Sequence, residues 1–114
     1  MIKRSSDNRI IVSNKKILKN MFTQGTGLMF KRGIKDIGYV FVFKKEHIIG
    51  ITMLFVFFPV DVLFLDSEKK VVEIVQNLRP FRNYWPKQKA KYVIELPKGT
   101  AYQKDIHIRD ELKF

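Results

Sequence analysis

The side chain whose position most suggests chemistry is Asp61, a carboxylate inside an apolar run of eighteen residues from Ile48 to Leu65. A buried carboxylate has to be paired with a cation or hydrogen-bonded. Asp61 is therefore a candidate catalytic or ligand-binding group in a cleft. The alternative is a structural side chain, either charge-paired or accepting hydrogen bonds from turn amides after Pro59. We favour the structural interpretation, because structural ion pairs also perturb carboxylates.

The other titratable side chains form no catalytic or metal-binding pattern. Asp66 lies five residues after Asp61, so on one regular strand the two carboxylates would face opposite sides. A turn role for Asp66, together with Ser67, fits better. His47 and His107 are the only histidines, and neither has the spacing of a metal-binding motif. We therefore predict no metal site.

No cofactor motif is present either. The chain contains no cysteine, which excludes disulfides, thiolate zinc sites and iron–sulfur clusters. Gly25-Thr26-Gly27 lacks the third glycine of a dinucleotide loop, and no lysine follows it at the spacing of a phosphate loop. We predict a protein without a cofactor and without a disulfide-linked partner.

Residues 79–92 are the best candidate for a binding surface on general grounds, because cations alternate there with aromatic rings. The side chains in question are Arg79, Arg82, Tyr84, Trp85, Lys87, Lys89 and Lys91. Cations of this kind hold phosphates while rings stack on unpaired bases. In the alternative interpretation, which we favour, the rings pin a long loop onto a sheet and the lysines form its solvated face.

The net charge of +11, from 22 basic and 11 acidic residues, makes a polyanion or nucleic acid a possible partner. A field of this sign raises the encounter rate with polyanions. Charge alone carries no information about specificity.

The apolar run from Ile48 to Leu65 has the minimum length of a membrane-spanning helix. Asp61 would place a charge within the bilayer, and Pro59 would break the helix. The rest of the run is rich in Phe, Val and Ile, which favour strands. We therefore predict two buried strands, about 50–57 and 60–65, and no membrane span. Because no continuous apolar signal follows the N-terminus, we expect a cytoplasmic protein.

The remaining pattern predicts short strands separated by turns. Ser13 or Asn14 is expected to cap a short helix containing Ile17, Leu18, Met21 and Phe22. Strands are expected at 39–43, 71–75 and 90–96, followed by two short ones around 106–108 and 112–114, with turns at 44–47 and 66–69. The predicted fold is mainly β, sandwich-like or barrel-like, with one or two short helices. We expect a basic, flexible segment at 1–9 and one domain at 10–114.

Four ordered motifs make the chain similar to a known family. They are Gly27-Leu28-Met29-Phe30, then Gly38-Tyr39-Val40-Phe41-Val42-Phe43, then Met53 with Pro59 to Asp66, and finally Tyr92 to Leu96 with Pro97-Lys98-Gly99-Thr100. Over residues 12–114 the chain resembles the domain of unknown function 192 family, also called uncharacterised protein family 0127. It looks most like the archaeal branch. The resemblance implies a mainly β sandwich and no established activity.

The chain departs from the family pattern at several positions. Many members have Phe-Trp-Met where this chain has Ile51-Thr52-Met53, and asparagine in place of Phe55. Many also have arginine directly after the Gly-Leu-Met-Phe motif, where this chain has Lys31 and then Arg32. The resemblance thus makes Lys31 or Arg32 the expected cation beside Asp61, and the three residues together the expected ligand-binding group.

The favoured function from the sequence is a non-catalytic binding or accessory module for a small ligand or a polyanion. Two alternatives stay open. One is a hydrolase-like or other enzyme with Asp61 in a cleft. The other is a protein that binds single-stranded nucleic acid through residues 79–92.

Overall fold

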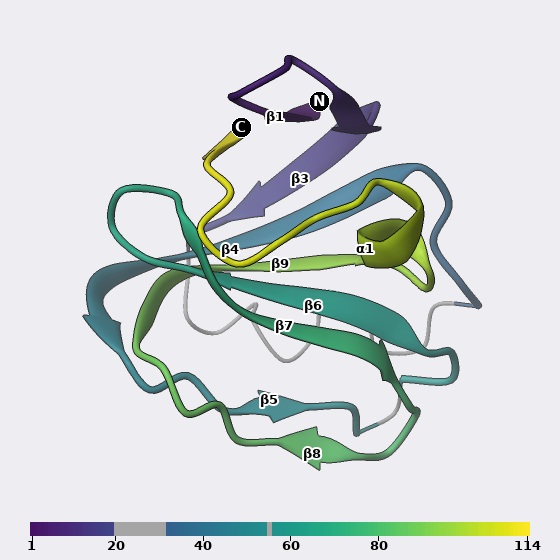
Figure 1. Cartoon of the computed structure of the whole chain (residues 1–114). Coiled ribbons are helices and arrows are strands. Elements are labelled where there is room, and N and C mark those ends of the chain that lie inside the picture. Colours follow the sequence, from purple (N-terminus) through teal and green to yellow (C-terminus); the bar gives the residue numbers. More distant parts are fainter. Residues whose placement is uncertain (20–31, 55) are drawn as a thin grey trace.

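The computed structural model describes residues 1–19, 32–54 and 56–114 (Figure 1). Its centre is a five-stranded sheet in the order β3-β4-β9-β6-β7. Within it β3 pairs parallel with β4, and every other neighbouring pair is antiparallel. The bounds of these strands are β3 Asn14–Leu18, β4 Ile37–His47, β6 Val60–Leu65, β7 Val71–Leu78 and β9 Ala90–Pro97.

Two smaller sheets lie on either side of the central sheet (Figure 1). One has the order β10-β1-β2 and the other pairs β5 with β8. Their bounds are β1 Ile2–Arg4, β2 Ile10–Val12, β5 Ile51–Thr52, β8 Asn83–Tyr84 and β10 Leu112–Lys113. One short helix, α1 (Thr100–Gln103), follows β9.

Both faces of the central sheet are covered, which explains why its strands are continuous apolar runs rather than alternating ones. Side chains of β1, β2 and β10 pack on one face around Leu63 and Ile94. On the other face, Ile49, Met53 and Val56 pack against Phe41, Phe64 and Val93. In β9, Val93 and Glu95 therefore face the second core, whereas Ile94 and Leu96 face the first.

The mainly β fold predicted from the sequence is confirmed. The strands expected at 39–43, 60–65, 71–75 and 90–96 are present as parts of β4, β6, β7 and β9. Among the described residues, no helix is long and apolar enough to cross a membrane.

Several local expectations were wrong. Asn14–Leu18 forms strand β3 beside β4 instead of starting a helix, because its backbone completes the edge of the central sheet. Met21 and Phe22 of that expected helix lie outside the described residues. The turn expected at 44–47 is the continuation of β4, and the strand expected at 50–57 is only β5. Residues 106–108 form no strand, and the helix α1 was not foreseen.

The N-terminal segment takes part in the fold. Ile2 is fully buried, and β1 pairs with both β2 and β10. Arg4 is 7% exposed, and its guanidinium donates to the carbonyl of Asp105 and to the carboxylates of Asp7 and Asp110. These contacts tie the start of the chain to its last ten residues.

Candidate functional site

Asp61 is enclosed by protein, and both of its carboxylate oxygens accept hydrogen bonds from backbone amides. It is fully buried, and its Oδ1 accepts a hydrogen bond from the backbone N–H of Asn77 at 2.9 Å. Its Oδ2 accepts one from the N–H of Ala101, also at 2.9 Å. These amides belong to β7 and α1 rather than to the turn after Pro59. The Asp61 carboxylate is therefore covered by protein and does not lie in the open cleft that the enzyme hypothesis requires.

Of the two expected partners of Asp61, only Arg32 lies within the described residues, and it does not reach Asp61. Arg32 is exposed and forms no ion pair with Asp61 in the part of the chain that the structure describes. Lys31 and the Gly25-Thr26-Gly27 stretch lie outside the described residues. The predicted ligand-binding group of Lys31, Arg32 and Asp61 therefore gains no support from the fold.

A second buried carboxyl group, that of Glu95, is in a different situation. Glu95 lies on β9, where its cross-strand neighbours are Tyr39 on β4 and Val62 on β6. It is 7% exposed, and no hydrogen bond or ion pair to its carboxyl group occurs among the described residues. Burial without a partner raises the pKa of Glu95 to about 8. At pH 7 the group is therefore mainly a neutral carboxylic acid.

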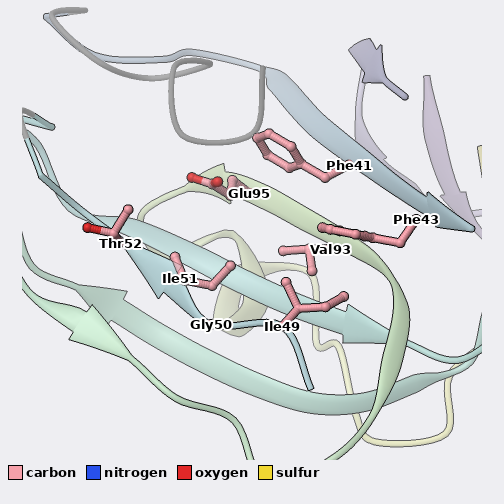
Figure 2. A pocket seen from close by; sticks show the side chains of 8 residues that line it. All are labelled: Phe41, Phe43, Ile49, Gly50, Ile51, Thr52, Val93 and Glu95. Atoms are coloured by element: carbon pink, nitrogen blue, oxygen red, sulfur yellow. The ribbon is translucent and has the colours of Figure 1, made fainter. Parts of the chain in front are cut away.

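The Glu95 carboxyl group lies in the wall of a small pocket (Figure 2). The pocket has a volume of about 130 Å³. Its walls come from β4, β9 and the segment that contains β5, and are lined by Phe41, Phe43, Ile49, Gly50, Ile51, Thr52, Val93 and Glu95. In Figure 2 the rings of Phe41 and Phe43 flank one side, and the aliphatic side chains of Ile49, Ile51 and Val93 lie below them.

The described lining combines two polar side chains with aromatic and aliphatic ones. A protonated carboxyl group can donate one hydrogen bond and accept others. Thr52 supplies the only other polar side chain among the described residues that line the pocket. These described lining residues include no pair of a nucleophile and a base within hydrogen-bond distance, and the described part of the chain contains no cluster of three His, Asp or Glu side chains that could hold a metal ion.

The sequence contains a signal for Glu95. Glu95 is an acidic residue within a strand of apolar residues, which is the same pattern that singled out Asp61. The two residues lie on neighbouring strands but face opposite sides of the sheet, since Asp61 is opposite Leu96 whereas Glu95 is opposite Val62. Sequence alone does not show that one of them meets two amides and the other an unfilled pocket.

The basic aromatic segment 79–92 divides into a pinned part and an exposed part. The ring of Tyr84 packs at a centroid distance of 5.9 Å from Phe64, and its hydroxyl group donates to Oε2 of Glu73. Glu73 Oε1 also accepts the backbone N–H groups of Lys87 and Gln88. Tyr84 thus anchors the segment, as the structural interpretation expected.

Trp85 behaves differently, because its side chain is 75% exposed. The cations Arg79, Arg82, Lys87 and Lys89 are exposed as well, whereas Lys91 is half-buried with its ammonium group 5.7 Å from the Tyr92 ring.

The histidines and Asp66 have local partners. His47 Nδ1 lies 2.9 Å from the carbonyl oxygen of Lys45, and His107 Nε2 lies 2.7 Å from Asp105 Oδ1. Asp66 Oδ1 accepts the N–H groups of Glu68 and Lys70, which is the turn role expected for it. None of these three side chains lines the Glu95 pocket.

Comparison with known proteins identifies relatives in sequence and in fold. Residues 2–114 match the model of the DUF192 family, described as "Uncharacterized ACR, COG1430". A UPF0127 protein of Pyrococcus abyssi is 34% identical over 86% of this chain and 83% of its own length. One from Pyrococcus horikoshii is 30% identical over 100% of this chain and 98% of its own length.

Two solved structures share the fold. A Sinorhizobium meliloti protein, proposed to be a transcription regulator, superposes with a TM-score of 0.82 at 24% identity, over 87% of this chain and 79% of its own. A Novosphingobium aromaticivorans protein of unknown function has a TM-score of 0.82 at 20% identity, over 88% of this chain and 74% of its own. At these identities the similarity concerns the fold alone.

Proposed function

This chain belongs to the uncharacterised DUF192 family, whose name assigns no activity, and we propose from its own residues that it is a binding module for a small, largely apolar molecule that carries one hydrogen-bond-accepting oxygen. The observation that carries the proposal is the Glu95 carboxyl group, which is buried in the wall of a pocket with mostly aromatic and aliphatic side chains and has no hydrogen-bond partner among the described residues.

The Glu95 carboxyl group has no hydrogen-bond partner among the described residues. Its oxygen atoms are open to the pocket, because Ser5 Oγ is the only sealed side-chain atom without a partner in the part of the chain that the structure describes. A ligand oxygen that accepts a hydrogen bond from protonated Glu95 gains about 0.5–1.5 kcal/mol. An acidic side chain that faces a pocket and has no protein partner there supports binding at this position.

The pocket lining defines the rest of the ligand. Aromatic and aliphatic walls favour apolar groups through the removal of their surface from water. An engineered apolar cavity of about 150 Å³ in another protein holds one benzene molecule. A pocket of about 130 Å³ therefore accommodates a ligand, or the end of a ligand, of roughly the same size.

A pair of isosteric probes tests this proposal. Cyclohexanone has a carbonyl oxygen where methylenecyclohexane has a CH₂ group, so the two differ mainly in hydrogen bonding. Binding at pH 6 is followed by NMR through the methyl signals of Ile49, Ile51 and Val93. For molecules with so few atoms we expect dissociation constants on the order of millimolar.

The Glu95→Leu variant removes the hydrogen-bond donor while keeping the side chain similar in size. We expect it to bind cyclohexanone about 5–10-fold more weakly than the native protein, the equivalent of one hydrogen bond, and to bind methylenecyclohexane at least as well. Glu68→Leu, which removes an exposed carboxylate from the turn after β6, serves as the matched control. Equal losses for both probes, or no binding of either by the native protein, would overturn the proposal.

A further inference from the structure

Trp85 forms an exposed aromatic platform beside the β5–β8 pair. Its indole ring packs against the backbone at Gly50, where an added Cβ would overlap the six-membered ring. The side chain is nevertheless 75% exposed. The contact with the Gly50 backbone holds the indole ring in place, and the rest of the ring is open to solvent. A planar group of another molecule can therefore stack on the exposed part of the ring.

A shallow hollow adjoins the platform. It is lined by Gly50, Ile51, Thr52, Asn83, Tyr84 and Trp85 and has a volume of about 430 Å³. Asn83 is exposed, and its amide group offers a donor and an acceptor beside the ring. The hollow lies across β5 from the Glu95 pocket, since both are lined by residues 50–52.

Basic side chains precede and follow Trp85 in the chain, with Glu46 of β4 as an acidic neighbour of Lys89 and Lys91. Arg79, Arg82, Lys87 and Lys89 are exposed, and none forms an ion pair within the described ranges. No Asp or Glu occurs at positions 74–94. The acidic residue just before that stretch, Glu73, is occupied by the Tyr84 hydroxyl group and two backbone amides. The segment therefore presents cations and the exposed Trp85 ring on a loop that Tyr84 anchors.

We propose that this surface binds single-stranded nucleic acid, with a base stacked on Trp85, its edge beside Asn83 and the neighbouring phosphates held by the surrounding cations. Stacking on an aromatic ring requires an unpaired base, and the cations require a charged backbone, so single-stranded nucleic acid meets both needs. The proposal is independent of the Glu95 pocket. An anionic membrane surface offers charge but no base to stack, and the experiment below separates the two.

The intrinsic fluorescence of Trp85 reports on the proposed contact directly, because it is the only tryptophan in the chain. The full-length protein is titrated with a uridine decamer at 50 mM and at 200 mM salt. We expect quenching of the emission on binding. If about three phosphates are contacted, the affinity falls by roughly 15–20-fold between the two salt concentrations.

Variants assign the effect to the platform. Trp85→Ala, followed by fluorescence anisotropy of a dye-labelled decamer, should weaken binding about tenfold or more. Tyr102→Ala removes an aromatic side chain that is 80% exposed on α1, away from the basic segment, and should leave binding unchanged. Glu95→Leu should also leave it unchanged.

The double variant Lys87→Gln/Lys89→Gln should reduce the salt dependence without abolishing the quenching of Trp85. Absence of binding at 50 mM salt would overturn the proposal, as would equal losses for Trp85→Ala and Tyr102→Ala. Quenching by vesicles of anionic phospholipid together with no response to the decamer would also overturn it, because the surface would then recognise a membrane.

Discussion

The replacement Glu95→Gln should change how the stability of this protein depends on pH. Glutamine keeps the size of the side chain and its polarity but cannot ionise. In the native protein, the pKa of Glu95 is raised from 4.5 to about 8 because the side chain is 7% exposed and its carboxylate form has lost its hydration. The folded state therefore binds one more proton than the unfolded state between these two pH values.

The sign and size of the effect follow from this proton. Where the folded state holds the extra proton, the free energy of unfolding falls as pH rises. The contribution of protonated Glu95 is complete below pH 4.5 and is lost as pH rises to about 8. An interval from 4.5 to about 8, at about 1.4 kcal/mol per pH unit, corresponds to a loss of up to about 5 kcal/mol.

Urea unfolding at pH 5, 7 and 9 measures the effect in both proteins. His47 and His107 are present in both proteins, so any contribution that they make cancels in the difference. We expect the native protein to lose several kcal/mol relative to Glu95→Gln between pH 5 and pH 9. Parallel dependences on pH in the two proteins would refute the reasoning, because Glu95 would then be ionised throughout or solvated in the folded state.

Two further predictions concern the buried charges that the fold uses for structure. Asp61→Ala leaves the N–H groups of Asn77 and Ala101 without their acceptor. We therefore expect the free energy of unfolding, measured with urea, to fall by about 2–5 kcal/mol. A fall of less than about 1 kcal/mol would contradict the role given to Asp61. Arg4→Met removes the hydrogen bonds to Asp7, Asp105 and Asp110. We expect the free energy of unfolding to fall by about 2–4 kcal/mol and the backbone amides of β1 to exchange faster with solvent. Unchanged amide exchange in β1 would show that Arg4 does not hold the N-terminal strand.

The strands were predictable where both of their faces are buried. Val60–Leu65 and Ala90–Pro97 are read as strands because a short, continuous run of branched and aromatic residues fits a sheet covered on both sides. Asn14–Leu18 was mistaken for a helix start because Ile17 and Leu18 fit a helical spacing as well as an edge strand. Such short segments take the structure that the neighbouring strand imposes, here parallel pairing with β4.

The candidate site was harder to foresee than the fold. Asp61 and Glu95 give the same signal, an acid in an apolar strand, and differ only in what covers them. The Asp61 side of the sheet brings two backbone amides to the carboxylate, and those amides come from residues 16 and 40 positions away. On the Glu95 side, β5 and its flanking residues leave a pocket. Contacts between segments so distant in the chain are set by the fold and are not encoded in any local pattern.

A carbon-13 NMR titration of the Glu95 carboxyl group, with and without cyclohexanone, tests the central claim most directly. We expect the free protein to titrate with a pKa of about 8. A saturating probe should raise that pKa further, because it accepts a hydrogen bond from the protonated form only. A pKa near 4.5 in the free protein, or one that does not move when the probe saturates the pocket, would contradict the account.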